Sequence, residues 1–220
     1  MIDRIMKRFR RSGKSWDQQF SDTTAVPPWR GRTALDVHER ALDSSWIKPD
    51  SDILDVGCGE GTITLRLAER TSGRIHGIDI SNLAIDLAQK GAQLANASHR
   101  LTYEVVDLFD SDGFLNQNRS RFDLAVDVGC FHNFQKENDE IFIIKLMAEL
   151  LKPHGKWLLA MRAFRDESKT SFQQEEQQLT DHLRAVTSGL FHLERVEKCD
   201  LTGPNSPKEM PGLAFFFVKI

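Results

Sequence analysis

The chain has 220 residues, a length that a single α/β domain with one sizeable core accounts for. Hydrophobic residues make up 40% of it and charged residues 28%, a balance typical of globular proteins that argues against a disordered or fibrous chain. Its formal net charge of −3 gives the molecule as a whole no electrostatic attraction to nucleic acid, so a nucleic-acid partner is disfavoured.

The first 14 residues differ in charge from the rest of the chain. Six Lys or Arg side chains stand there against one acid, and apolar residues recur at helical spacing, which predicts a short basic amphipathic helix. The helix could contact a membrane surface or nucleic acid or act as a targeting signal; we favour a frayed arm or a lid helix. No apolar run approaches the roughly 18 to 20 residues that cross a bilayer, and there is no secretory signal pattern. We therefore expect a cytoplasmic protein without a transmembrane segment.

From Ser51 onward, β-rich runs alternate with helical patterns, which is typical of βαβ units around a mostly parallel sheet. Strands are expected at 52–56, 74–78, 101–106, 122–128, 156–161, 191–199 and 213–220, and helices at 34–45, 62–70, 83–95, 137–152 and 171–188. No helical pattern separates the last two strands, so they should be antiparallel neighbours. The predicted fold class is α/β: a Rossmann-like seven-stranded mostly parallel sheet with helices on both faces and an antiparallel C-terminal strand pair.

The three cysteines, Cys58, Cys130 and Cys199, lie far apart in the sequence and form no CxxC pair. This spacing argues against a disulfide framework and against structural zinc. We expect reduced thiols and no metal site.

The strongest local pattern is a buried strand that enters the glycine-rich run 57–61 and then a helix. Glycines at such a bend let the backbone approach a ligand closely. The next strand ends at Asp79, 18 residues after Gly61. A carboxylate at this place lies beside the loop and can accept both hydroxyls of a ribose. Loop and acid together predict a cofactor that contains a nucleoside.

Two residues distinguish this loop from that of a dinucleotide-binding enzyme. Thr62 stands where the G-x-G-x-x-G pattern has its last glycine, and Asp55 would meet a bound pyrophosphate with a negative charge. A cationic cofactor fits better, because Asp55 could lie near the ammonium group of S-adenosylmethionine. A nicotinamide-dependent oxidoreductase remains a less favoured alternative.

The run Asp55-Val56-Gly57-Cys58-Gly59-Glu60-Gly61 resembles the first motif of class I S-adenosylmethionine-dependent methyltransferases. The resemblance extends through Asp79, Val106-Asp107-Leu108, Phe122-Asp123-Leu124 and Leu151-Lys152-Pro153-His154-Gly155, and covers roughly residues 34–220. It implies S-adenosylmethionine as the cofactor and methyl transfer as the activity.

The resemblance also implies roles for single residues. Gly57 and Gly59 would face the methionine portion of the cofactor, Asp79 would hold the ribose, and Asp107 with Leu108 would border the adenine. The full set of expected cofactor residues is Trp16, Trp29, Asp55, Gly57, Cys58, Gly59, Asp79, Ile80, Asp107, Leu108 and Asp127.

Residues after the fourth and fifth strands should face the acceptor, because ligands of open α/β sheets lie beyond the carboxyl ends of the strands. The catalytic candidates there are His132, Asp127 and Arg162. His132 could act as a base, since neutral imidazole is available near pH 7, or it could be a structural residue. Arg162, with Arg165 nearby, could hold an anionic acceptor or pair with an acid such as Asp127.

The run 129–132, Gly-Cys-Phe-His, together with Trp16-Asp17 and the run 27–31, resembles a bacterial branch of small-molecule methyltransferases of the thiopurine and tellurite type. In that branch an N-terminal segment with a Trp covers the cofactor. We therefore expect residues 1–32 to be a basic arm and possible lid, with Trp16, Phe20 and Trp29 as covering residues, and 33–220 to be the methyltransferase domain. The acceptor would be a small molecule with a sulfur, oxygen or nitrogen nucleophile. A catalytically silent cofactor-binding subunit for a partner protein is the alternative.

Overall fold

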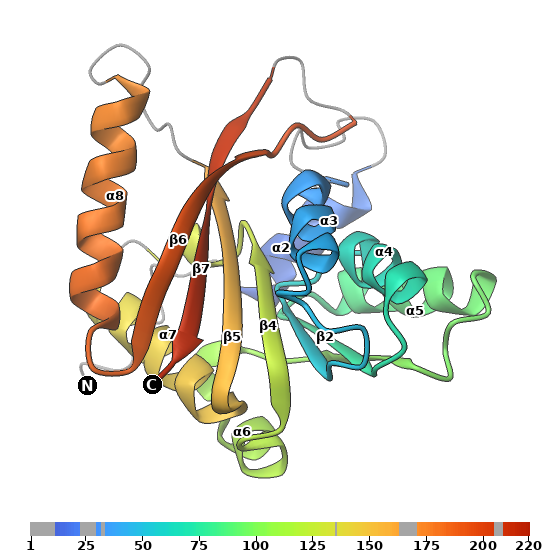
Figure 1. The fold of residues 1–220 in the computed structure, drawn as a ribbon. Helices are drawn as coiled ribbons and strands as arrows, with labels where there is room; N and C mark the ends of the chain where they lie inside the picture. The colour runs from blue at the N-terminus through green and yellow to red at the C-terminus, as the bar shows by residue number, and fades with distance from the viewer. Residues whose placement is uncertain (1–11, 23–29, 32–33, 135, 163–170, 205–208) are drawn as a thin grey trace, which may run out of the picture.

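The computed structural model describes residues 12–22, 30–31, 34–134, 136–162, 171–204 and 209–220. In these residues seven strands form one sheet in the order β3-β2-β1-β4-β5-β7-β6 (Figure 1). The strands are β1 (Ile53–Val56), β2 (Ile75–Asp79), β3 (Leu101–Val105), β4 (Phe122–Val128), β5 (Leu151–Arg162), β6 (Phe191–Asp200) and β7 (Pro211–Lys219). Neighbours from β3 to β5 are parallel, whereas β7 is antiparallel to both β5 and β6. The predicted fold class is confirmed, including its antiparallel C-terminal pair.

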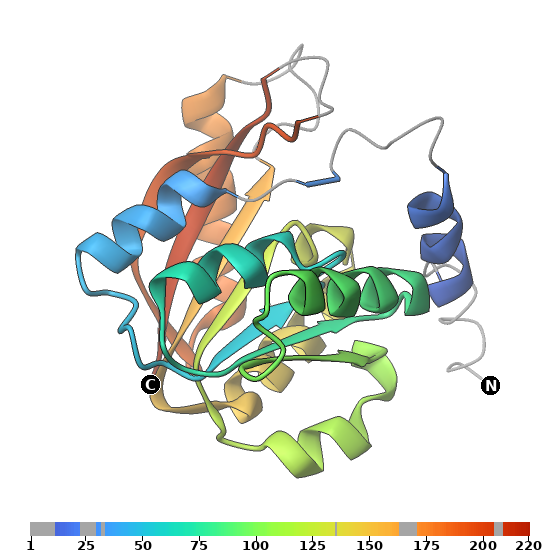
Figure 2. The same ribbon diagram turned by 90° about the vertical axis from the view of Figure 1, so that its right-hand side faces the viewer.

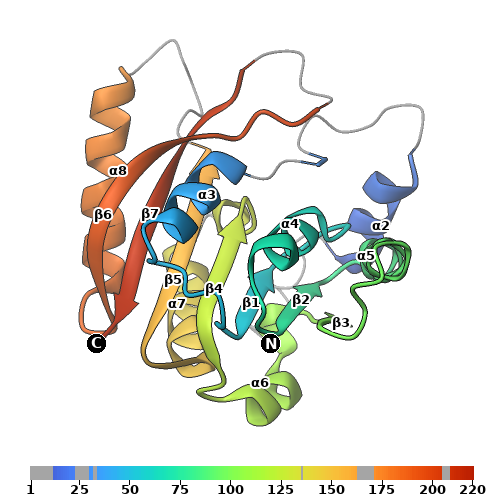
Figure 3. The ribbon, with the colours of Figure 1, turned by 45° about the vertical axis from the view of Figure 1, so that its right-hand side comes forward.

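Helices cover both faces of the sheet (Figure 3). One face carries α3 (Leu35–Asp43), α4 (Thr62–Arg70) and α5 (Asn82–Leu94), and the other carries α6 (Asp112–Asn118), α7 (Glu137–Leu150) and α8 (Phe172–Thr187). The short helices η2 (Leu108–Asp110) and η3 (Phe131–Asn133) follow β3 and β4. A further helix, α2 (Gly13–Ser21), packs against α5, as Figure 2 shows from the side.

Alternate residues of the strands enter two separate cores. Ile53 of β1 packs beneath α3 and α4, whereas Leu54 packs on the side of α6 and α7. In β7, Phe216 belongs to the first core and Phe215 and Phe217 to the second. Burial on both faces explains why these strands read as continuous apolar runs in the sequence.

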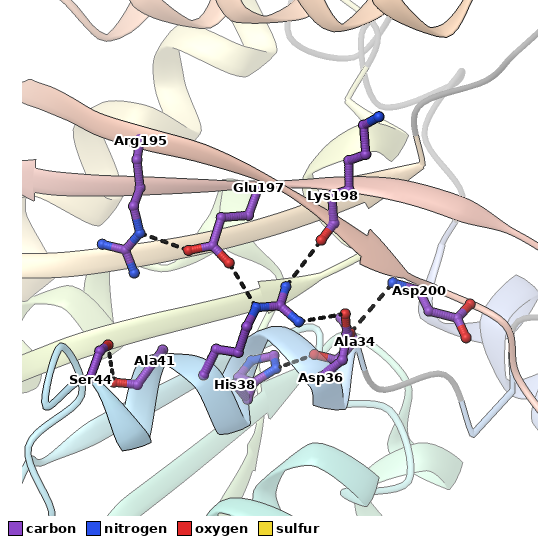
Figure 4. Close-up of polar contacts among 10 residues, drawn as sticks. Ala34, Asp36, His38, Ala41, Ser44, Arg195, Glu197, Lys198 and Asp200 are labelled. Carbon is purple, nitrogen blue, oxygen red and sulfur yellow. Dashed lines mark hydrogen bonds and ion pairs between the residues drawn. The ribbon is translucent and has the colours of Figure 1, made fainter.

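The contact between α3 and β6 illustrates how a helix is fixed on the sheet (Figure 4). Arg40 donates to the Glu197 carboxylate at 3.0 Å and to the Lys198 carbonyl at 3.1 Å. The Arg40 side chain is 49% exposed, so this ion pair contributes less than about 1 kcal/mol. Burial of Val37 and Ala41, both fully excluded from solvent, is the larger contribution.

Most predicted elements agree with the structure within two residues, and α4 agrees at both ends. β5 begins five residues earlier than predicted, at Leu151, because Leu151 already pairs with Phe122. The pairing between β4 and β5 is then interrupted, and it resumes where Lys156 pairs with Leu124. Within the interruption His154 has a φ of 60°. Residues 153–155, expected to connect the helix 137–152 to the strand 156–161, thus lie inside β5. Four helical elements, α2, α6, η2 and η3, were not predicted.

The predicted basic helix falls largely on residues 1–11, which lie outside the described residues. Across the described ranges, no helix combines the length and the apolar character needed to span a membrane.

Candidate active site

A cavity of about 1460 Å³ opens at the carboxyl ends of β1, β2 and β4. The strand register brings these ends together, because Val56 lies level with Ile78 on one side and with Asp127 on the other. Small-molecule sites usually measure roughly 300–1,000 Å³. This cavity therefore has room for two ligands side by side.

The glycine loop between β1 and α4 forms one wall of the cavity. Gly57 has a φ of +67°, and a Cβ added there would lie 2.6 Å from the Cβ of Cys130. Gly59 also has a positive φ, +54°, and the ring of Phe20 lies 3.5 Å from the position of its missing Cβ. The loop is thus held between the segment after β4 and the N-terminal helix. Gly57 leaves no room for a Cβ, and the positive φ at both positions would strain any residue that has a side chain.

The Asp79 carboxylate lies at the end of β2 and lines the same cavity. One oxygen accepts from the backbone N–H of Gly59 at 3.0 Å and the other from that of Ser81 at 2.9 Å. Burial raises the pKa of Asp79, and the two amides oppose that shift. Each carboxylate oxygen can accept a further hydrogen bond, so Asp79 can still receive hydroxyl donors from a ligand.

Asp55 lies deeper, on β1, where it is 2% exposed and still lines the cavity. It accepts a hydrogen bond from the Thr64 hydroxyl at 2.8 Å. Burial, and secondarily the charge of Asp79, raises the pKa of Asp55 to about 7. A cation bound nearby would favour the ionised form.

Asp127 occupies a different place from the one expected. It is 1% exposed and is absent from the cavity wall, which is formed instead by the residues that follow it in the chain. Its oxygens accept from the backbone N–H of Cys130 at 2.9 Å and of Phe131 at 3.1 Å. Asp127 therefore supports the turn after β4, and its side chain does not line the cavity.

His132 and Arg162 do line the cavity, as expected. The His132 ring rests on Gly129, whose missing Cβ position lies 3.2 Å from the ring Cε1. Arg162, at the end of β5, is exposed and makes no ion pair within the described residues, Asp127 included. Arg165 lies outside the described residues.

The other end of the cavity is lined by Ile80, Asp107 and Leu108, all of them predicted. Asp107 accepts from the Phe109 backbone N–H at 3.0 Å and so begins η2. Phe109 and Phe134 also line this end, with ring centroids 5.3 Å apart. Phe134 belongs to the segment after the fourth strand, which was expected to face the acceptor, whereas Phe109 was missed because nothing local separates it from a core aromatic.

The N-terminal segment contributes Trp16 and Phe20 to the cavity wall, whereas Trp29 lies outside the described residues. Arg30 was not predicted, yet its guanidinium donates to Glu60 of the glycine loop at 2.8 Å. It also donates to the Phe20 carbonyl at 3.3 Å. No pattern in the sequence indicates this pair, since its members are 30 residues apart.

The three thiols are free, and two of them lie at the cavity. Burial raises the pKa values of Cys58 and Cys130 well above the ordinary range, so both stay protonated near neutral pH. Cys199 lies on β6, in the other core. Within the described parts of the chain, no three His, Cys, Asp or Glu side chains are grouped as metal ligands.

Comparison with known proteins connects this geometry to a family. The family described as "Methyltransferase domain" matches residues 53–155. Residues 53–155 of the chain are therefore similar to a methyltransferase domain. The match includes the glycine loop, Asp79, Asp107 and the whole segment after β4.

Among the relatives, 2-heptyl-1-hydroxyquinolin-4(1H)-one methyltransferase of Mycobacteroides abscessus is 34% identical over 113 residues, which are 51% of this chain and 46% of that protein. Ubiquinone biosynthesis O-methyltransferase of Neisseria meningitidis is 29% identical over 129 residues, 56% of this chain and 50% of that protein. The chain thus spans about half the length of these curated relatives.

A solved structure concerned with the conversion of a disulfide bond into a thioacetal group during echinomycin biosynthesis has a TM-score of 0.70. It is 19% identical, and the match covers 94% of this chain and 92% of that one. At this identity the likeness shows a shared fold, and the activity must be argued from the site.

Proposed function

We propose that the protein transfers the methyl group of S-adenosylmethionine to a small-molecule acceptor by in-line displacement at the methyl carbon. The observation that carries the proposal is the Asp79 carboxylate, which the amides of Gly59 and Ser81 hold at the wall of a cavity large enough for two ligands. A carboxylate fixed beside a glycine loop is suited to the two hydroxyls of a ribose.

The residues of the cavity fit S-adenosylmethionine better than a dinucleotide. Asp55 lies near the end of β1, just before the glycine loop, where its negative charge would repel a pyrophosphate. Burial raises the pKa of Asp55 to about 7, and an ammonium group bound nearby would stabilise its ionised form. We assign the ribose to Asp79, the amino-acid end to Gly57 and Asp55, and the adenine to Ile80, Asp107 and Leu108.

The bound cofactor would supply an electrophilic methyl group, and the protein's main contribution would be alignment. Holding two reactants in line can lower a barrier by about 7 to 11 kcal/mol. His132 lies at the cavity and could accept a proton from a thiol, hydroxyl or amine nucleophile. Trp16 and Phe20 would exclude water above the reactants, as the resemblance to the thiopurine and tellurite type implies.

Arg162 indicates the charge of the acceptor. It is exposed at the cavity and has no ion-pair partner in the described part of the chain. A guanidinium beside a cationic cofactor is favourable only when an anion offsets it. We therefore propose an acceptor with a carboxylate or a similar anionic group. The curated relatives are named for a hydroxyquinolinone and for ubiquinone biosynthesis, which supports a small organic acceptor.

Thermal unfolding with S-adenosylhomocysteine and with NAD tests the cofactor assignment. We expect S-adenosylhomocysteine to raise the unfolding temperature and NAD to leave it unchanged; stabilisation by NAD alone would indicate an oxidoreductase. Turnover on a panel of thiols, phenols and amines, each with and without a carboxylate, then tests the activity. Cofactor binding without any turnover would favour a catalytically silent subunit.

A further inference from the structure

The N-terminal helix α2 is attached to the segment that carries the ribose acid. Its first residue, Gly13, lies so close to this segment that an added Cβ would be 2.5 Å from the Ile80 carbonyl oxygen. One turn later, Asp17 faces the start of α5. Figure 3 shows α2 beside α5 at the end of the sheet where β2 and β3 lie.

The Asp17 carboxylate binds two donors from the first turn of α5. Its Oδ1 accepts from the Ser81 hydroxyl at 2.6 Å and from the Leu83 backbone N–H at 3.1 Å. These two bonds, that from Ser81 first, lower the pKa of Asp17, so the group is ionised throughout the neutral range. The Leu83 amide is one of the N–H groups that a helix start leaves without an internal partner.

Ser81 relays this contact to the cofactor site. It is fully buried, and its hydroxyl also accepts from the Ala84 amide at 3.1 Å as the N-cap of α5. Its own backbone N–H donates to Asp79 Oδ1 at 2.9 Å, while Asp79 Oδ2 accepts from Gly59. A chain of hydrogen bonds therefore runs from Asp17 through Ser81 and Asp79 to the glycine loop.

We propose that Asp17 is a positioning residue of the nucleoside site: it fixes Ser81, and through the Ser81 amide it fixes the carboxylate that receives the ribose. The inference rests on the proposed function, because it names Asp79 as the ribose acid. On this proposal α2 contributes to cofactor affinity through Asp17, in addition to covering the cavity with Trp16 and Phe20. Without Asp17, the first turn of α5 loses its contacts through the Ser81 hydroxyl and the Leu83 amide, so the Ser81 backbone amide that orients Asp79 is held less firmly before the cofactor binds.

Calorimetric titration of the full chain with S-adenosylhomocysteine tests the proposal. We expect Asp17→Ala to raise the Kd by about tenfold, the effect of one well-placed hydrogen bond to a charged group. Asp17→Asn keeps an acceptor oxygen for Ser81 and should raise the Kd by less than about threefold. Gln18→Ala, an exposed neighbour on the same helix, is the control and should leave the Kd unchanged.

A double-mutant cycle separates positioning from general loosening of α2. If Asp17 acts through Ser81, the variant with both Asp17→Ala and Ser81→Ala binds no more weakly than Ser81→Ala alone. Independent effects that multiply would overturn the relay. In turnover, Asp17→Ala should raise the KM for S-adenosylmethionine and leave kcat unchanged, and an equal loss in kcat would contradict a role confined to cofactor binding.

The unmodified chain provides a second measurement that needs no variant to fold. Binding of S-adenosylhomocysteine should slow hydrogen exchange of the amides in 13–21 and of Leu83, and unchanged exchange there would overturn the proposal. Equal Kd values for the unmodified chain and Asp17→Ala would overturn this inference alone. Absence of S-adenosylhomocysteine binding by the unmodified chain would overturn the proposed function and the inference with it.

Discussion

The buried carboxyl of Asp55 should make both stability and cofactor affinity depend on pH. Burial raises its pKa from the ordinary 3.8 to about 7, so the folded protein holds a proton that the unfolded chain has released. The free energy of unfolding from this group is therefore largest below pH 4 and falls as the pH rises toward 7. The whole change corresponds to about 4 kcal/mol, at about 1.4 kcal/mol for each pH unit.

Urea unfolding of the ligand-free protein between pH 4.5 and 8 measures this change. Asp55→Asn keeps an acceptor for the Thr64 hydroxyl but cannot ionise, so its advantage in unfolding free energy should grow as the pH rises and level off above about 7. Asp127→Asn is the matched control for stability, because burial raises the pKa of Asp127 to about 7 as well. Each substitution should remove part of the pH dependence.

The two acids should differ in cofactor binding. Asp55 lines the cavity and Asp127 does not, so only Asp55 can meet the ammonium group of the ligand. Affinity for S-adenosylhomocysteine should rise with pH up to about 7, with release of a proton detectable by calorimetry in two buffers of different ionisation enthalpy. Asp55→Asn should abolish this rise and Asp127→Asn should retain it. The same pH dependence in all three proteins would refute the assignment of the ammonium group to Asp55.

Three further predictions concern the rest of the site. Asp79→Ala should weaken S-adenosylhomocysteine binding at least about a hundredfold in a folded protein, because two hydrogen bonds to a charged acceptor are lost, at about 1.5–3 kcal/mol each; unchanged affinity by calorimetry would remove Asp79 from the site. Deletion of residues 1–32 should lower kcat/KM more than it lowers the free energy of unfolding, since Trp16 would no longer cover the reactants, and normal kinetic constants would reject the lid. Arg162→Gln should raise the KM for anionic acceptors only; equal losses on neutral acceptors would indicate a structural role.

The sequence was most informative where local pattern and burial agree. The strand–loop–helix run from β1 to α4 could be read directly, because a strand buried on both faces is apolar throughout and its bend needs glycine. The acid of β2 followed from its distance along the chain. The helix α6, only seven residues long and containing Gly113, gave no helical pattern and was missed.

The position of Asp127 shows that the order of strands and loops along the chain does not by itself predict which side chains face the cavity. It ends a strand whose carboxyl end faces the cavity, so sequence reasoning placed its side chain there. The φ of +82° at Gly129 turns the chain back, however, so that the amides of Cys130 and Phe131 reach the Asp127 carboxylate. A buried acid that accepts two amides is satisfied locally, and the turn it supports presents His132 instead.

The contacts of the N-terminal segment were also not predictable from chain order, because they join residues far apart in the sequence. In the sequence, the prominent feature of this segment is its basic charge. In the structure, α2 contacts the glycine loop and the residues after β2 through a small residue, an acid and an aromatic ring: Gly13, Asp17 and Phe20. Asp17 and Ser81 are 64 residues apart, so no local spacing rule connects them. The boundary at residue 32, between an N-terminal arm and a methyltransferase domain, remains a prediction. If Asp17 positions Asp79 as proposed, the functional unit extends across that division, because the nucleoside site is complete only with α2 in place.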